Sequence, residues 1–201
     1  MPTPPFLPGT LYHVYNRGVS RQTVFAKDAH YRHFLELLAH HVVPCARVYA
    51  FALLPNHFHL VAEPRDDAPR SASQALSNAC NAYAQHFNRD TSRSGALFCR
   101  PFQRKAVTDE RYFAALVRYV HGNAQHHGLL PDGAAWPYTS EALITSDRPT
   151  LLERGAVRGW LCQPDTLSGS DVLTGLAQIV EELGDGLLAP LDTLSGCLEI
   201  P

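Results

Sequence analysis

Hydrophobic residues follow two different patterns along the first 130 positions of the chain. Short apolar runs that are rich in aromatic and β-branched residues and end at turn signals predict β-strands. These runs cover 11–16, 47–54, 57–62 and 101–107. Apolar residues that recur every three or four positions predict helices. The predicted helices cover 29–42, from Ser71 or Ser73 to about 88, and from Thr108 or Asp109 to about 126.

The order of these elements is β-α-β-β-α-β, followed by one more helix. Asp28 is the predicted cap of the first helix, and Pro55-Asn56 is the predicted turn of a hairpin between the second and third strands. We therefore expect an α+β protein with a ferredoxin-like antiparallel sheet, two helices on one of its faces and an additional C-terminal helix. Because this fold serves many functions, it does not select one.

The formal net charge of -2 combines two regions of opposite sign. Positions 1–130 carry 14 Lys and Arg against 8 Asp and Glu, a balance of +6, and all 11 histidines lie there. Positions 131–201 carry 3 against 11, a balance of -8. A basic, histidine-rich body is typical of a module that binds polyanions, although a solvated charged surface explains the same counts equally well.

The change in charge also suggests a division of the chain. We expect residues 1–140 to form one domain and residues 141–201 to form an acidic C-terminal extension, for which the sequence indicates no role. One amphipathic helix is expected near 171–183.

Cysteine spacing and hydropathy indicate the compartment. The five cysteines include no Cys-x-x-Cys pair, so we expect free thiols. No run approaches about 18 uninterrupted apolar residues, and the first ten residues lack the basic start and apolar centre of a secretory signal. We expect a cytoplasmic protein with no membrane partner.

The stretch LLPNHFHL places His57 and His59 two positions apart on a predicted strand. Side chains at this spacing point to the same face of a strand, about 6 to 7 Å apart, and two imidazoles there can converge on one cation. Two histidines that serve only the packing of the strand are an equally good interpretation of the pair alone.

The third predicted helix adds Tyr119 and Asn123, which are four positions apart and share a flank beside the apolar stripe. An amide oxygen suits Mg²⁺ or Mn²⁺, and two imidazoles favour Mn²⁺ or a Mg²⁺ that retains waters. Tyr119 can then act as a nucleophile on a phosphodiester that the metal polarises. For Tyr119 alone, an aromatic side chain that covers the sheet is the favoured interpretation.

Basic and aromatic residues alternate between positions 85 and 118, where seven Lys and Arg face three Asp and Glu. Basic groups neutralise phosphates, and aromatic faces stack on unpaired bases. For Phe98 and Phe102, however, a place in the core is the favoured interpretation. The expected DNA-binding residues are Arg17, Arg93, Arg100, Arg104 and Lys105.

Four motifs in order resemble the REP-associated tyrosine transposases, which are single-tyrosine transposases of the HUH endonuclease superfamily. The resemblance covers about 12–140. It departs from the family's usual Asn-Pro-Val at Asn123-Ala124-Gln125. The motifs are YHVYNRG at 12–18, LLPNHFHL at 53–60, GALFCRPF at 95–102 and RYVHGNAQHHGL at 118–129.

The resemblance implies that His57 and His59 are the metal-binding pair, that Asn123 is a further ligand and that Tyr119 is the catalytic nucleophile. It implies a Mg²⁺- or Mn²⁺-dependent enzyme that cuts and rejoins single-stranded DNA beside a REP-like hairpin through a 5′-phosphotyrosine intermediate, with no organic cofactor. It favours a monomer and leaves a homodimer open.

Two other functions are compatible with the same residues. One is a domesticated relative that binds DNA hairpins without cutting them. The other is a metallohydrolase that uses a metal-bound water, in which Tyr119 is only structural.

Overall fold

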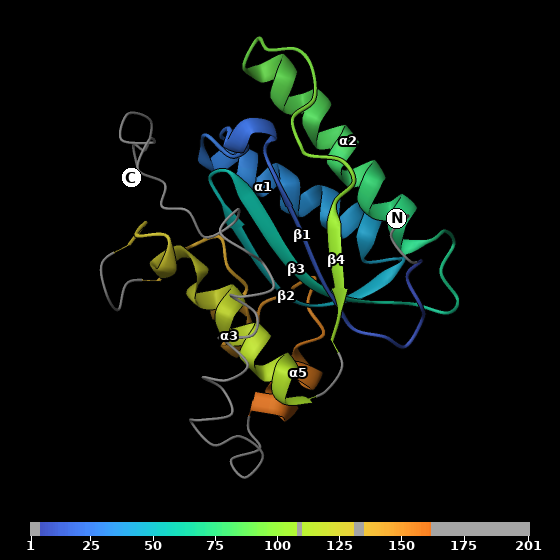
Figure 1. The fold of residues 1–201 in the computed structure, drawn as a ribbon. Coiled ribbons are helices and arrows are strands. Elements are labelled where there is room, and N and C mark those ends of the chain that lie inside the picture. The colour runs from blue at the N-terminus through green and yellow to red at the C-terminus, as the bar shows by residue number, and fades with distance from the viewer. Residues whose placement is uncertain (1–4, 108–109, 131–134, 162–201) are drawn as a thin grey trace.

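The computed structural model describes residues 5–107, 110–130 and 135–161. Its centre is an antiparallel sheet in the order β2-β3-β1-β4, in which β1 lies between β3 and β4 (Figure 1). The protein is of the α+β class, and helices cover both faces of its antiparallel sheet. The four strands are β1 (Tyr12–Arg17), β2 (Ala46–Leu54), β3 (His57–Pro64) and β4 (Gln103–Ala106).

Five α-helices accompany the sheet in the described part of the chain. The first continues without a break into a π-helical turn, η2 (Leu38–Val42), and a short 3-10 turn, η1 (Val19–Arg21), follows β1. The helices are α1 (Asp28–Leu37), α2 (Ala72–Asp90), α3 (Glu110–His126), α4 (Glu141–Thr145) and α5 (Arg154–Leu161).

The predicted element order, β-α-β-β-α-β and one more helix, is confirmed. Ser71 caps α2, since its hydroxyl accepts a hydrogen bond from the backbone N–H of Gln74 at 3.2 Å. The prediction that Asp28 caps α1 is wrong, because Lys27 is the N-cap residue and makes no side-chain cap. The Asp28 carboxylate instead pairs with Arg32 and accepts from the Tyr138 hydroxyl, each at 2.5 Å.

Two predicted features fall outside the described residues: the cap of α3 at Thr108 or Asp109, and the helix near 171–183. None of the described helices is long and apolar enough to cross a membrane. Cys45, Cys80 and Cys99 are free thiols.

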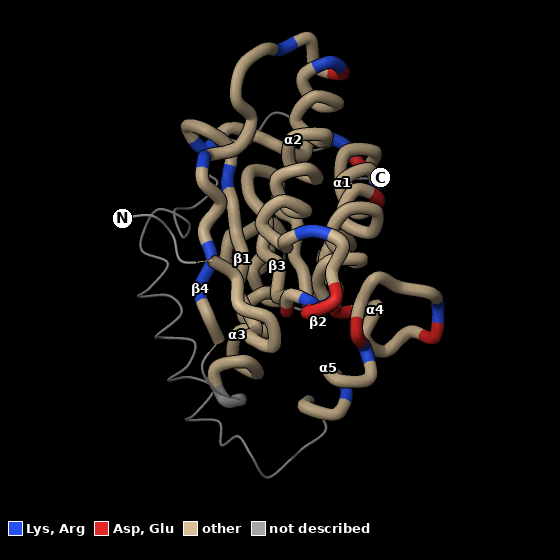
Figure 2. Tube along the Cα trace, turned by 90° about the vertical axis from the view of Figure 1, so that its right-hand side faces the viewer, with Lys and Arg blue, Asp and Glu red and all other residues tan. Residues whose placement is uncertain are grey.

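The two faces of the sheet are covered by different helices. Phe58 and His59 are consecutive residues of β3, so their side chains project to opposite faces. Phe58 packs on Phe34 of α1 with ring centroids 5.1 Å apart, whereas His59 contacts Tyr119 of α3 at 5.6 Å. In Figures 1 and 2, α1 and α2 accordingly lie together on one side of the strands, and α3 crosses the other side.

The described segment after α3 packs against the sheet edge and against α3. The Trp136 indole donates to the Leu53 carbonyl of β2 at 2.7 Å, and the Trp160 ring of α5 lies 4.3 Å from that of Phe113. Helix α3 therefore packs on both the sheet and α5, and most of its described side chains are buried. The domain boundary at 140 remains a prediction, and most of the predicted extension lies outside the described residues.

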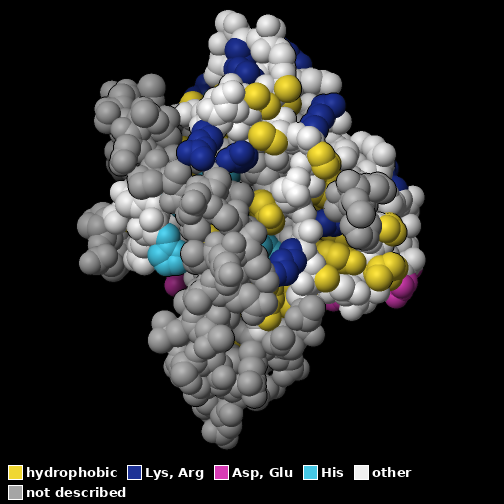
Figure 3. Space-filling view, in the orientation of Figure 1, with side chains coloured by type: hydrophobic (Ala, Val, Ile, Leu, Met, Phe, Trp, Pro, Cys, Tyr) yellow, Lys and Arg dark blue, Asp and Glu magenta, His cyan; other side chains and the backbone are white. Residues whose placement is uncertain are grey.

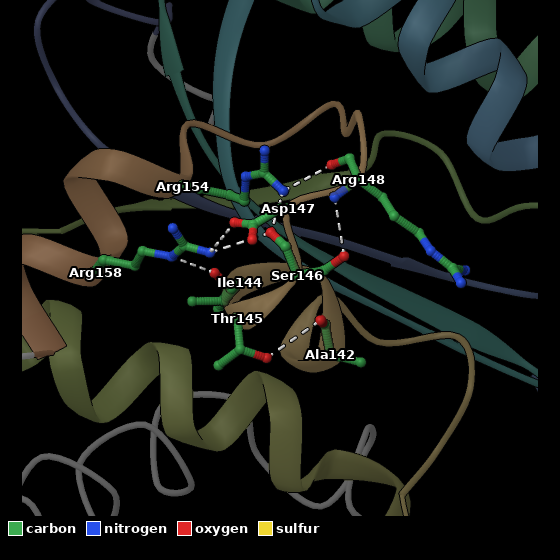
Figure 4. Close-up of polar contacts among 8 residues, drawn as sticks. All are labelled: Ala142, Ile144, Thr145, Ser146, Asp147, Arg148, Arg154 and Arg158. Carbon is green, nitrogen blue, oxygen red and sulfur yellow. Dashed lines mark hydrogen bonds and ion pairs between the residues drawn. The ribbon is translucent and has the colours of Figure 1, made fainter.

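Two arginines of α5 hold this segment together (Figure 4). The Arg158 guanidinium donates to the carbonyls of Ile144 and Ser146, at 2.5 and 3.1 Å, and Arg154 donates to the Arg148 carbonyl at 2.7 Å. These cations lie at the C-terminal end of α4, where free carbonyls need donors.

Candidate active site

The histidines of β3 face the polar flank of α3. Asn123 places its side-chain oxygen 3.2 Å from Nε2 of His57, and the Tyr119 ring lies 5.6 Å from the His59 ring. The spacings match, since two residues of a strand and four residues of a helix both advance by about 6 to 7 Å. The structure therefore brings together the four side chains predicted for the metal and the nucleophile, each no more than 2% exposed.

His57 lies between two amide oxygens. Its Nδ1 is 2.6 Å from Oδ1 of Asn56, and its Nε2 is 3.2 Å from Oδ1 of Asn123. Burial lowers the pKa of His57 to about 3, helped by the neighbouring His127 and opposed by the contact with Asn123, so the ring is neutral at neutral pH. A neutral imidazole has one N–H. The shorter contact assigns that proton to Nδ1, which leaves the Nε2 lone pair facing the Asn123 oxygen.

Two facing lone pairs are stabilised by a cation that binds both. Metal–ligand bonds of about 2.1 Å at right angles separate neighbouring ligand atoms by about 3 Å, which is close to the distance between His57 Nε2 and Asn123 Oδ1. The residues present therefore fit a small divalent cation. Among the described residues no cluster of three His, Cys, Asp or Glu side chains could hold a metal ion. The donor set proposed here differs, because one donor is an amide oxygen.

Three further polar atoms at this place are buried without a hydrogen-bond partner: Nε2 of His59, the Tyr119 hydroxyl and the Asn123 amide nitrogen. A buried polar group without a partner costs about 1 to 3 kcal/mol. Native structures tolerate such groups where a ligand or a catalytic step uses them. Burial also lowers the pKa of His59 well below its ordinary value, so its ring is neutral.

Tyr119 is fully buried, and burial raises the pKa of its hydroxyl to about 12, with the Asn123 side chain acting in the opposite direction. The phenol is therefore protonated at neutral pH. Its hydroxyl is closed to solvent.

The predicted DNA-binding arginines occupy different environments. Arg100 is exposed and lines a cleft of about 730 Å³ between α2 and the loop that leads to β4, where it donates to Asn81 at 2.7 Å. Arg93 is anchored to Asn88 and Gln22 at 2.6 and 2.9 Å. Figure 3 shows Lys and Arg side chains, but no Asp or Glu among the coloured ones, over the region of α2 and β4.

Other predicted DNA contacts lie in β1 and β4. Arg104 is half-buried, with its guanidinium 4.5 Å from the centre of the Phe6 ring, and it donates to Ser73 at 3.2 Å. Lys105 lies 5.2 Å from the Tyr112 ring centre. Arg17 is the register partner of His57, which places it at the end of the sheet beside the candidate site.

The favoured interpretation of Phe98 is confirmed. Its side chain is buried, and its ring lies 5.8 Å from that of Phe58 and 6.0 Å from that of Tyr83, within the core. Phe102 is only half-buried and stacks on Phe6 with ring centroids 6.2 Å apart.

The sequence did not single out three side chains that surround the candidate site. Nε2 of His13 on β1 lies 2.9 Å from Nδ1 of His59, Asn56 holds His57 as described, and the His127 ring lies 4.8 Å from that of His57. Asn56 directly precedes His57 and could have been found from that adjacency. His13 depends on the register of β1 against β3, which the sequence does not reveal.

Comparisons with known proteins place the fold. No family model and no curated protein matches this chain. A solved structure of a REP-associated tyrosine transposase bound to a REP hairpin is similar over 71% of this chain and 82% of that chain, with a TM-score of 0.54 and 16% sequence identity. The resemblance predicted from the motifs is thus confirmed by a shared fold.

Proposed function

We propose that this protein is a metal-dependent single-stranded DNA endonuclease and strand transferase, a transposase that uses Tyr119 as its nucleophile. The observation that carries the proposal is the meeting of Tyr119 and Asn123 of α3 with His57 and His59 of β3. The shared fold with a hairpin-bound transposase supports it, as does the β2-β3-β1-β4 order, which agrees with a ferredoxin-like sheet.

The proposed reaction conserves the energy of the broken linkage. The Tyr119 oxygen attacks the phosphorus of a DNA phosphodiester, the bond from phosphorus to the 3′ oxygen breaks, and the phenolic proton is transferred overall to that oxygen. The products are a 5′-phosphotyrosine and a free 3′-OH. A 3′-OH of another strand then reverses the reaction and releases Tyr119.

His57, His59 and Asn123 would hold Mg²⁺ or Mn²⁺, which when bound supplies a Lewis acid for a non-bridging phosphate oxygen. The protein's own residues do the rest. Asn56 and His13 hold the two imidazoles, and the packing of α3 on β3 sets the distance between Tyr119 and the ligands.

The proposed substrate is single-stranded DNA beside a REP-like hairpin. Arg100 is the leading candidate for a phosphate contact, because it is exposed at the cleft beside α2, whose lining includes the amides of Asn81 and Gln85. Arg17, Arg93, Arg104 and Lys105 are proposed to contribute to the same basic surface. We propose a monomer as the working unit.

A second function is favoured by one observation, the complete burial of Tyr119. A domesticated relative that binds hairpins without cutting them needs no access to this hydroxyl. The two functions are separated by incubating the protein with a labelled hairpin oligonucleotide and Mn²⁺ and running a denaturing gel.

The transferase predicts a covalent protein–DNA band that requires Mn²⁺ and disappears in Tyr119→Phe. Tyr15→Phe is a matched control, since the Tyr15 ring lies 6.1 Å from the His59 ring on the same face of the sheet. Binding without a covalent band under any divalent metal would support the non-catalytic relative. Multiple turnover by Tyr119→Phe with release of a free 5′-phosphate would support a metallohydrolase.

A further inference from the structure

His13 makes the contact on which this inference rests. In the register of the sheet, Tyr15 of β1 is paired with His59 of β3, so His13, two residues earlier, is the diagonal neighbour of His59 on the same face. The Nε2 atom of His13 lies 2.9 Å from Nδ1 of His59, and the two side chains are 1% and 0% exposed.

A contact of this length between two ring nitrogens contains one shared proton, since two lone pairs or two N–H groups would repel each other. Either Nδ1–H of His59 donates to His13, or Nε2–H of His13 donates to His59. In the second case the single proton of a neutral His59 must sit on its Nε2. That atom is buried and has no acceptor among the described residues.

We propose that His13 is a positioning residue that accepts the Nδ1–H of His59, and so holds His59 in the tautomer whose Nε2 lone pair is directed into the candidate site. The proposal rests on the proposed function in one respect, the role of His59 as a metal ligand. Metal-binding histidines usually donate their second ring N–H to a neighbouring acceptor, which fixes their tautomer and orientation.

The other histidine of the site shows the same arrangement. Nδ1 of His57 lies 2.6 Å from Oδ1 of Asn56, closer than its Nε2 lies to Oδ1 of Asn123 at 3.2 Å, so the shorter contact assigns the proton of a neutral His57 to Nδ1 and its lone pair to Nε2. Each candidate ligand therefore has an acceptor at Nδ1 and presents Nε2. Asn56 comes from the turn before β3 and His13 from the neighbouring strand, so the two contacts arise independently.

The first test reads the tautomer in metal-free protein. Long-range ¹H–¹⁵N correlation spectra of ¹⁵N-histidine-labelled protein distinguish a protonated from an unprotonated ring nitrogen. We expect His59 to carry its proton on Nδ1 in the wild type and in His13→Gln, whose carbonyl oxygen can accept the same hydrogen bond. In His13→Leu the Nε2–H form should appear. A wild-type His59 with its proton on Nε2 would overturn the proposal.

The second test measures Mn²⁺ affinity by calorimetry. We expect His13→Leu to bind Mn²⁺ about 10- to 100-fold more weakly, in the range found for residues that orient metal ligands, and His13→Gln to recover most of the loss. His121→Leu is a matched control, because His121 is a half-buried histidine of α3 whose ring contacts Ser140 outside the site. Equal affinity of His13→Leu and wild type would overturn the proposal.

These outcomes are independent of DNA cleavage. If the tautomer and the affinity changes are as expected but no covalent DNA adduct forms, the proposed function fails and the role of His13 stands. If the adduct forms while His13→Leu keeps full Mn²⁺ affinity, the proposed function stands and the role of His13 fails. Should His13→Leu not fold, the wild-type and His13→Gln spectra still decide the question.

Discussion

Oδ1 of Asn123 lies 3.2 Å from Nε2 of His57, although the two residues are 66 positions apart in the chain. One packing contact explains this, because α3 crosses β3 with the Tyr119 ring beside that of His59 and Asn123 beside His57. The same contact therefore brings the candidate metal ligands and the candidate nucleophile to one place. A shift of α3 along the strand would separate both pairs at once.

The role of Asn123 can be tested by comparing a variant that lacks its side-chain oxygen with one that keeps an oxygen there. Asn123→Ala removes a candidate ligand, and we expect Mn²⁺ affinity to fall at least about tenfold, which corresponds to about 1.4 kcal/mol. Asn123→Asp supplies a carboxylate oxygen, a ligand that hard divalent cations prefer, and should retain the affinity. Calorimetry on both variants, with helicity checked by circular dichroism, gives the comparison. Unchanged affinity in Asn123→Ala would remove Asn123 from the site.

Replacing either of two glycines by alanine should change the stability of the protein, in opposite directions for the two positions. A Cβ at Gly18 would lie 2.2 Å from the Gln22 carbonyl oxygen, so the backbone must shift, and we expect Gly18→Ala to lose about 1 to 3 kcal/mol of unfolding free energy. At Gly122 in α3 the nearest atom is 3.8 Å away, and alanine favours helix by about 0.5 to 1 kcal/mol. Chemical denaturation measures both changes.

The Gly18 substitution should also affect the site. The Gly18 N–H donates to the Asn56 carbonyl at 2.8 Å, and Asn56 holds His57. Gly18→Ala should thus weaken Mn²⁺ binding as well as stability. A variant that loses neither would contradict the described path of the chain after β1.

Buried histidines predict an acid-sensitive fold. Burial lowers the pKa of His13 and of His57 to about 3 and that of His121 to about 4. In the unfolded chain each titrates near 6.5, so between these values the unfolded state binds more protons. For the metal-free protein, the contribution of these neutral histidines to the free energy of unfolding is fully present above pH 6.5. Below that pH the free energy of unfolding falls by about 1.4 kcal/mol per pH unit for each such histidine.

Urea unfolding at a series of pH values checks this slope. His121→Gln removes one of the three groups and should flatten the curve between pH 4 and 6.5. If the wild-type stability were constant over that range, the three imidazoles would not be buried and neutral as described.

Two arginines of the basic surface should give different defects. Arg100 is exposed at the cleft, so Arg100→Ala should weaken hairpin DNA binding and reduce the slope of log affinity against log salt by about one. Arg104 lies against the Phe6 ring, so Arg104→Ala should lower stability through lost packing as well. Binding titrations at several salt concentrations, with thermal unfolding of each variant, separate the two effects.

Local patterns predicted much of this fold. Short apolar runs bounded by turn signals predicted the strands, helical periodicity predicted α1 to α3, and the motif spacing singled out His57 and His59 as well as Tyr119 and Asn123. The partners of those residues were less accessible. His13 contacts His59 only because β1 lies between β3 and β4, and strand order depends on contacts between distant segments. Asp28 looked like a helix cap, yet its carboxylate is engaged by Arg32 and Tyr138.

The burial of the candidate site was also beyond sequence reasoning. Helical periodicity suggests one apolar stripe on α3, but the helix packs on the sheet and also contacts α5, and Tyr119 and Asn123 are both 0% exposed. The contact between α3 and α5 pairs Phe113 with Trp160, which is distant in the sequence. No local pattern indicates such a contact.

In the proposed reaction, the Tyr119 oxygen becomes bonded to DNA. Protein incubated with a hairpin oligonucleotide and Mn²⁺ can be digested with protease and nuclease, and the peptides that carry a nucleotide can be identified by mass spectrometry. We expect the modification on the peptide that contains Tyr119, only when metal is present. A modification on Tyr15 or on another residue, or none under conditions in which the DNA is cut, would contradict it.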